Sequence, residues 1–198
     1  MIFAKARTAV AAITLSLLSA GCATTGAAPT EMNFVPARWD HRPEATVWTN
    51  AALAALDRHG VALVETVPRD AGVWCPGYGE ATEQERKAFW VGLLSALAKH
   101  ESTWNPEAVG GGGQWFGLVQ ISPATARGYG CEHTSGDALK NGSGNLSCAI
   151  RILSHTVPRD GVVAEGGRGV AADWGPFHSA AKRAEMMEWT RNQSYCKA

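Results

Sequence analysis

The chain has 198 residues, with 18 basic and 18 acidic side chains, so its formal net charge at pH 7 is zero. This length allows one domain with a buried core. The balanced charge argues against nucleic acid as a partner, because nucleic-acid binding requires a basic face. Eight tryptophans are many for such a chain, but tryptophan both stacks on sugar rings and fills cores, so their number is only suggestive.

The N-terminal segment, residues 1–22, has the pattern of a targeting sequence. Two basic residues precede the apolar run from Ala9 to Leu18, which is too short to span a membrane. The segment then resembles a bacterial lipobox, with Cys22 as the residue that is acylated after cleavage, although Ser19 stands where leucine is usual. An ordinary secretory peptide, cut near residue 20 or 23, is the alternative.

Residues 23–45 show no periodicity and are interpreted as a tether that leads into a domain over residues 46–198. Thr49 and Asn50 predict the start of a helix from Ala51 to His59, which a glycine ends. The apolar run that follows, at 61–67, is a strand or a helix fragment. Residues 68–79 are rich in proline and glycine and predict a loop.

A strong helix pattern begins at Thr82, which forms a capping box with Glu85. Phe89, Leu93 and Leu97 recur every fourth residue, as on one face of an amphipathic helix. The next position in this series is Glu101, at the C-terminal end of the predicted helix. A carboxylate therefore falls where the pattern requires a buried apolar group.

Two forces disfavour the charge of such a carboxylate. Burial in apolar surroundings raises its pKa, and the C-terminal end of a helix is the negative end of the helix dipole. A glutamate that is neutral at pH 7 can donate a proton, as the acid of a glycosidase does. The alternative is that the helix frays after Lys99 and that Glu101 is solvated.

The rest of the chain predicts short elements separated by glycine-rich loops. The four glycines at 110–113 indicate a tight turn and not a phosphate loop, since no GK[ST] sequence follows. Ser122 and Pro123 predict a helix start, and Gly130 ends that helix. The patterns further predict helices over 145–156, 170–174 and 179–192, with loops over 137–144 and 161–169.

Three pieces of sequence, in this order, resemble the soluble lytic transglycosylase (SLT) domain family, which is related to goose-type lysozyme. They are Ala98–Ser102, with its Glu-Ser pair, Trp104–Pro106, and Gly117–Ser122. The stretches 126–131 and 145–153 extend the match, which covers roughly residues 67–196. The resemblance implies a mostly α-helical, single lysozyme-like domain with a small β excursion at the glycine-rich turn.

The resemblance also implies an activity, namely cleavage of the β-1,4 bond between N-acetylmuramic acid and N-acetylglucosamine in peptidoglycan. Glu101 would protonate the leaving oxygen and later accept the proton of the C6 hydroxyl, which closes a 1,6-anhydro ring. One group with a near-neutral pKa can perform both steps. Ser102 and Gln120 would position the substrate, and Ser122 would line the same cleft. Local hydrogen bonding and helix capping are the alternatives for these three residues.

The family resemblance sets the expected surroundings of this enzyme. Its partner would be the peptidoglycan glycan strand, and its location the periplasm or cell envelope, anchored in the outer membrane through Cys22. No cofactor is expected. No metal site is expected either, because the cysteines form no CxxC motif and the six histidines are scattered.

The sequence departs from the family pattern at residues 171–176, where Asp173 stands at the position of the family's usual tyrosine. Asp173 and Trp174 are therefore candidate substrate-binding residues. If Asp173 enters the cleft, it could activate water, and the enzyme would be a lysozyme-type muramidase. A surface aspartate is the plain alternative. A weakly active glycan-binding module is a third interpretation, but an idle buried carboxylate at Glu101 would cost stability.

Four cysteines remain if Cys22 is lipidated, and an even number in an exported protein suggests two disulfides with three possible connectivities. A Cys131–Cys148 bond would close the loop between two helices. A Cys75–Cys196 bond would join the start of the domain to its end. We favour this pairing, although the spacing alone leaves the other connectivities open.

Overall fold

The computed structural model describes residues 1–2 and 35–197 of the chain. The predicted targeting segment, its Cys22 and the first part of the predicted tether lie outside these residues. Residues 35–197 belong to one compact unit. Within residues 35–197 no helix has the length and apolar character needed to cross a membrane.

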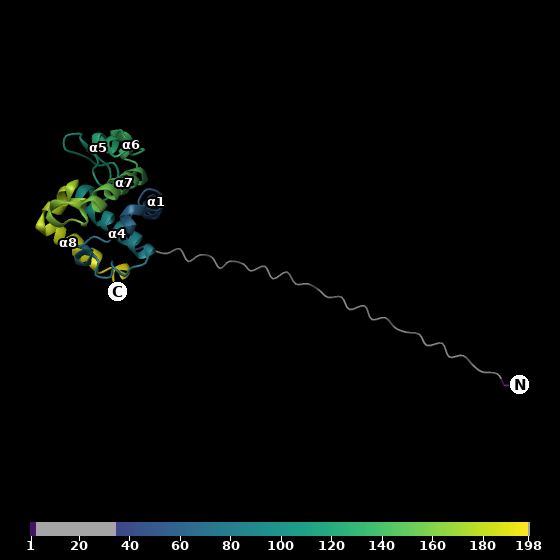
Figure 1. Cartoon of the computed structure of the whole chain (residues 1–198). Helices are drawn as coiled ribbons and strands as arrows, with labels where there is room; N and C mark the ends of the chain where they lie inside the picture. The colour runs from purple at the N-terminus through teal and green to yellow at the C-terminus, as the bar shows by residue number, and fades with distance from the viewer. Residues whose placement is uncertain (3–34, 198) are drawn as a thin grey trace. The chain divides into compact units, whose positions relative to one another are not determined.

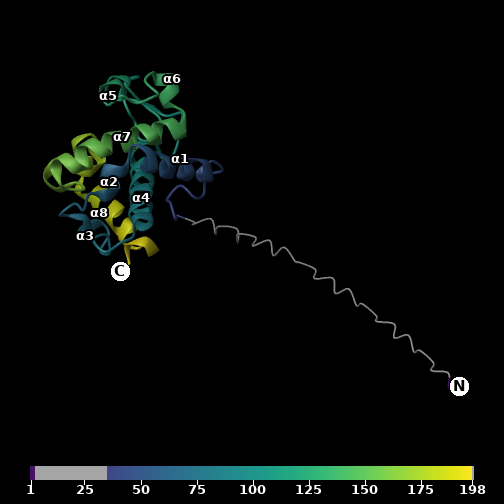
Figure 2. The ribbon, with the colours of Figure 1, turned by 45° about the vertical axis from the view of Figure 1, so that its right-hand side comes forward.

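The domain is mostly helical, as predicted, with one small hairpin (Figure 1). Its α-helices and strands are α1 (Ala45–Arg58), α2 (Val61–Glu65), α3 (Ala71–Trp74), α4 (Glu83–Ser102), β1 (Val109–Gly110), β2 (Trp115–Phe116), α5 (Pro123–Gly128), α6 (Gly136–Leu139), α7 (Gly142–Asp160) and α8 (Ala180–Arg191). Short 3-10 turns complete it: η1 (Glu165–Gly167), η2 (Gly169–Ala172), η3 (Gly175–His178) and η4 (Ser194–Cys196). Two views show α5 and α6 together at one end, with α8 and the C-terminus toward the other (Figures 1 and 2).

Helix α4 is the centre of the domain and contacts α1, α2, α8, η3 and η4. Its predicted capping box is present, since the Thr82 hydroxyl accepts from the Glu85 N–H and the Glu85 carboxylate accepts from the Thr82 N–H. The predicted apolar stripe is buried, but so is every residue from position 87 to 98. The helix is thus enclosed on all sides, which the stripe of an amphipathic helix does not require. The backbone at Gly92 illustrates this, because a Cβ there would lie 2.0 Å from the Tyr195 hydroxyl.

Helix α1 begins six residues before the predicted start at Ala51, and the chain is packed even before it. Trp39 is fully buried and stacks edge-on against Trp48, with ring centroids 5.9 Å apart. The Thr49 hydroxyl accepts a hydrogen bond from the Trp39 indole at 3.0 Å, so it does not cap a helix. Core packing therefore begins at Val35, ahead of the predicted domain start at residue 46. The rest of the predicted domain division stays a prediction.

Helix α7 is longer than the predicted 145–156 helix at both ends. Asn141 caps it, because its side-chain oxygen accepts the Gly144 N–H at 2.9 Å, and Gly161, with φ of 66°, ends it. Glycines in the first turn suggest a loop from sequence alone. Here they permit close packing, since a Cβ at Gly142 would lie 2.4 Å from the indole nitrogen of Trp48.

The favoured disulfide connectivity is confirmed, with Cys75 bonded to Cys196 and Cys131 to Cys148. The first bond joins the segment before α4 to the C-terminal turn η4. The second joins the loop after α5 to the second turn of α7. The predicted small β excursion is also present as the antiparallel pair β1–β2, in which Val109 pairs with Phe116.

Candidate active site

Glu101 lies in the last turn of α4 and lines a cavity of about 480 Å3. The cavity is lined by residues of five segments: His100, Glu101, Gly110, Gly111, Trp115, Gln120, Asp173, Trp174, Gly175, Pro176 and Lys182. Burial raises the pKa of Glu101 to about 7, and the positive charge of Lys182 opposes this shift. The Glu101 carboxyl therefore exists in both protonation states near neutral pH, as an acid that must later serve as a base requires.

The end of α4 is fixed by its own sequence. Thr103 and Trp104 have left-handed backbones, with φ of 52° and 56°, and their N–H groups donate to carbonyls of the last helical turn. The Trp104 indole donates to the Ser95 carbonyl at 2.9 Å, which folds the side chain back along the helix. These contacts hold Glu101 at a defined helix end and argue against the frayed end considered from the sequence.

Ser102 does not line the cavity. Its hydroxyl donates to the Leu118 carbonyl at 2.8 Å and lies 3.3 Å from the Ala98 carbonyl oxygen. The side chain thus joins the end of α4 to the loop that carries Gln120. Its direct role in substrate binding stays a prediction, and the contacts observed are those of a structural tie.

Gln120 lines the cavity and has a left-handed backbone with φ of 51°. Its side-chain N–H groups donate to the carbonyls of Ala108 and Gly117, at 3.2 and 2.9 Å. These bonds leave the side-chain oxygen as the free hydrogen-bonding group, and this oxygen packs over Gly110, where a Cβ would lie 2.3 Å from it. Gln120 can therefore accept a hydrogen bond from an N–H or O–H group of a ligand.

Ser122 forms the N-cap of α5 and is not part of the cavity wall. Its hydroxyl accepts the Thr125 N–H at 3.0 Å and lies 2.9 Å from the Thr125 hydroxyl. This is the capping role that its sequence position beside Pro123 predicts. A contact of Ser122 with substrate stays a prediction.

Asp173 and Trp174 both line the cavity, but in different ways. The buried Trp174 indole donates to the Val119 carbonyl at 2.8 Å, so it attaches the segment after η2 to the loop that carries Gln120. Asp173 is exposed to solvent. Its surroundings raise the pKa of its carboxyl through partial desolvation and the nearby charge of Asp160, against the attraction of Arg159.

Trp115 and Lys182 are among the cavity residues that were not candidates from sequence. Trp115 on β2 is 46% exposed, and its ring lies where a Cβ at Gly111 would approach to 2.1 Å. Lys182 lies in the first turn of α8. The position of Trp115 between the glycine-rich turn and Gly117 was a usable signal, because a short segment between two turn-forming glycine positions has little core to enter. Nothing in the sequence around Lys182 marks it.

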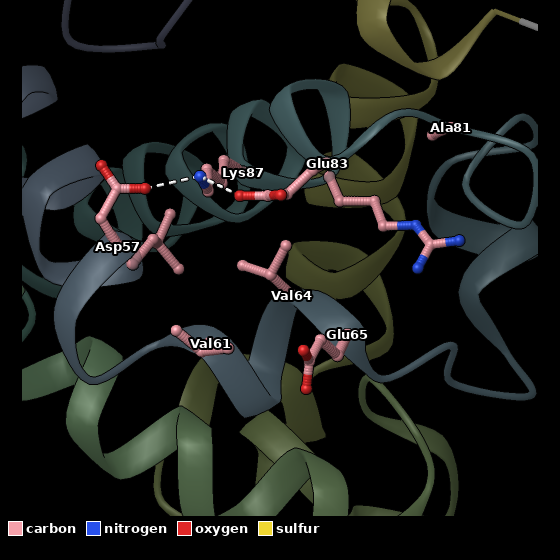
Figure 3. Close-up of a pocket in the computed structure, with 9 residues that line it drawn as sticks. Asp57, Val61, Val64, Glu65, Ala81, Glu83 and Lys87 are labelled. Carbon is pink, nitrogen blue, oxygen red and sulfur yellow. Dashed lines mark ion pairs between the residues drawn. The ribbon is translucent and has the colours of Figure 1, made fainter.

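A second cavity, of about 370 Å3, lies between the end of α1, α2 and the start of α4 (Figure 3). Val61 and Val64 are among its lining residues. Lys87, which is 6% exposed, pairs there with the carboxylates of Asp57 and Glu83. The buried ammonium group is thus neutralised within this cavity, which shares no lining residue with the Glu101 cavity.

Comparison with known proteins assigns the family. The family model described as "Transglycosylase SLT domain" matches residues 80–163. A solved structure of a Glu-to-Gln mutant of Bd0314 DslA is 30% identical with a TM-score of 0.73, and the match covers 80% of this chain and 96% of that one. A wild-type structure of DslA is 29% identical with the same TM-score, covering 82% and 98% of the two chains. No curated protein matches the sequence.

The chain belongs to the transglycosylase SLT domain family. Members of this family act on peptidoglycan in the periplasm or cell envelope. The cavity at the end of α4 lies within the matched segment at Glu101, Trp115 and Gln120, and is completed from outside that segment by residues 173–182.

Proposed function

We propose that this protein is a lytic transglycosylase that cleaves the bond between N-acetylmuramic acid and N-acetylglucosamine and forms a 1,6-anhydro product. The observation that carries the proposal is the Glu101 carboxyl, which lines a cavity of an SLT-family domain with a pKa raised to about 7. In this proposal Glu101 is the catalytic acid and then the catalytic base.

The reaction starts with transfer of the Glu101 proton to the glycosidic oxygen, which breaks the bond to the anomeric carbon. The substrate's own acetamido oxygen stabilises the positive charge that develops there. The ionised Glu101 then accepts the proton of the C6 hydroxyl, whose oxygen attacks the anomeric carbon. The proton that Glu101 donates is thereby restored, and no water is consumed.

The other cavity residues have positioning roles in this proposal. The free side-chain oxygen of Gln120 is suited to accept the N–H group of an acetamido substituent, because its own N–H groups are occupied. The exposed ring of Trp115 offers an apolar face to a sugar ring. Trp174 and, from outside the cavity wall, Ser102 support the loop that carries Gln120 through their bonds to the Val119 and Leu118 carbonyls.

A second candidate activity is hydrolysis, and Asp173 is the reason to consider it. This carboxyl group lines the same cavity as Glu101, so a water molecule between them could replace the C6 hydroxyl as the nucleophile. The product would then be heavier by one water molecule and would carry a reducing end.

Mass spectrometry of products from purified peptidoglycan tests the proposal. We expect anhydro-muropeptides from the wild-type protein and none from Glu101→Gln, with Glu107→Gln, an exposed glutamate outside the cavity, as the matched control. Hydrated products that vanish in Asp173→Asn would replace the proposal with the hydrolase. If the wild-type protein gives no product, the proposed activity is wrong and glycan binding remains as the function.

We further propose that Cys22 carries a lipid anchor in the outer membrane, as the lipobox-like sequence before it suggests. The test is fractionation of cells that express the full chain. Loss of the membrane fraction in Cys22→Ala supports the anchor, and an unchanged membrane fraction contradicts it.

A further inference from the structure

A third cavity, of about 260 Å3, has two arginines and two histidines in its lining. It lies between the end of α1, the loop after α5 and the first turns of α7. Its lining residues are Arg58, His59, Cys131, Glu132, His133, Gly144, Ser147, Cys148 and Arg151. It shares none of them with the Glu101 cavity.

The charges of this cavity are not balanced. Two arginines face one carboxylate, Glu132, which leaves a formal excess of one positive charge even when both histidines are neutral. Neither Arg58 nor Arg151 forms an ion pair with any residue of the described part of the chain. The cavity of Figure 3 is the opposite case, since its buried lysine is paired with two carboxylates.

The two histidines are held in place by backbone contacts. The Nε2 atom of His59 lies 2.9 Å from the Ser147 carbonyl oxygen, so the Nε2–H group donates there and Nδ1 remains free. The His133 ring packs on the backbone of Gly144, where a Cβ would lie 2.6 Å from the ring. The Cys131–Cys148 disulfide joins the loop that carries His133 to α7.

The positive charges act on His59. Burial lowers the pKa of the His59 imidazole, and the charges of Arg151 and Arg58 lower it further. Arg58 gains some stabilisation from the carbonyl end of α1, but Arg151 lies in the middle of α7 and has no comparable partner. The first turn of α7, with the positive end of its helix dipole, lines the same cavity at Gly144.

We propose that this cavity is a binding site for an oxyanion, a phosphate or carboxylate group that bridges the guanidinium groups of Arg58 and Arg151. The planar fork of arginine matches such groups, and a bound anion would offset the uncompensated positive charge of the cavity. Ser147 and His133 line the site as further residues with hydrogen-bonding side chains. This site is independent of the activity proposed for the Glu101 cavity.

Titration of the purified full-length protein with inorganic phosphate, and separately with glutarate, tests the site by NMR of the His59 imidazole. We expect saturable binding that raises the His59 pKa, because an anion offsets the field of the arginines. Phosphate alone would assign a phosphate-bearing ligand, and glutarate alone a carboxylate-bearing ligand. Either result supports the site.

The double variant Arg58→Gln/Arg151→Gln should bind at least about tenfold more weakly, and its His59 pKa should be higher without any ligand. Arg168→Gln removes an exposed arginine outside the cavity and should leave both properties unchanged. The proposal is overturned if neither anion binds more tightly than about 10 mM, or if the double variant and Arg168→Gln bind alike.

Discussion

The Nε2 atom of His100, the residue before Glu101, lies 2.8 Å from a carboxylate oxygen of Glu185 on α8. The same carboxylate accepts from Lys99 at 2.7 Å and from both terminal nitrogens of the Arg38 guanidinium. One half-buried glutamate of α8 therefore holds the last turn of α4 and the segment before α1 together. The hydrogen bonds from Arg38, Lys99 and His100 lower the pKa of Glu185.

Glu185→Gln should lower the free energy of unfolding by about 1–3 kcal/mol at pH 7, since three cationic or imidazole groups lose their charged partner. The folded pKa lies below the unfolded one, so the contribution is present above about pH 4.3 and fades as the pH falls below it. Urea unfolding at pH 7 and at about pH 3 should show this difference shrinking in acid.

Glu188→Gln is the matched control for this experiment. Glu188 is an exposed glutamate of the same helix and forms no ion pair with the described residues. Its substitution should change stability by less than about 0.5 kcal/mol. Equal effects of the two substitutions on the free energy of unfolding would show that the Glu185 contacts do not stabilise the fold.

The ionisation of Glu101 should lower stability, so its pH dependence is opposite to that of Glu185. Its folded pKa of about 7 lies above the unfolded value, so the folded state keeps a proton that the unfolded state releases. Stability should fall as the pH rises from about 4.3 to about 7, by up to roughly 3 kcal/mol. Glu101→Gln removes this loss, so melting should show the variant more stable than wild type at about pH 8 and similar at about pH 4. A variant that is less stable at both pH values would contradict the buried, protonated carboxyl.

The pH dependence of activity should follow the same group. Since bond cleavage needs protonated Glu101, kcat/KM should fall above a pKa near 7. Lys182→Gln removes the cation that opposes this shift, so it should move the falling limb to higher pH, whereas Lys182→Arg should leave it in place. Movement of the limb to lower pH in Lys182→Gln would contradict the assignment of this limb to Glu101.

The glycine-rich turn gives a matched pair of substitutions that tests Trp115. A Cβ at Gly111 would lie 2.1 Å from the Trp115 ring, whereas a Cβ at Gly112 meets nothing within 4 Å, and both residues have positive φ. Each alanine should cost about 1–2 kcal/mol of backbone strain. Only Gly111→Ala should also displace the ring and raise KM for glycan fragments. Equal KM values for the two variants would show that Trp115 does not contact substrate.

The sequence was most informative where one local rule decides the structure. The capping box at Thr82, the Ser122 cap and the left-handed Gly130 just after the end of α5 depend on neighbouring residues only, and all are observed. Helical periodicity and the family motif together predicted that Glu101 lies at the active-site cleft, and Glu101 lines a cavity. The substrate contacts of Ser102, Gln120, Ser122, Asp173 and Trp174 remain predictions, although three of these residues line the Glu101 cavity.

The sequence was least informative where distant segments decide the structure. Trp39 makes residues before α1 part of the core, because its partner Trp48 lies on that helix. The glycines that start α7 resemble a loop until the rings that pack on them are known. Lys182 enters the cavity only because α8 returns to the end of α4, a contact that no local pattern encodes.

The two disulfides should differ in their contributions to stability. Cys75 and Cys196 are 121 residues apart in sequence, whereas Cys131 and Cys148 are 17 apart. In the chain-entropy model a bond that closes the longer loop contributes about 5 kcal/mol, and the shorter about 3 kcal/mol. The double variant Cys75→Ser/Cys196→Ser should therefore lower the urea midpoint of unfolding more than the double variant Cys131→Ser/Cys148→Ser does. Loss of Cys131–Cys148 should also weaken binding of the anion that the titration identifies, because it releases the loop that carries His133, while loss of Cys75–Cys196 should not. A reversed order in both measurements would mean that neither the loop-length argument nor the proposed oxyanion site describes these bonds.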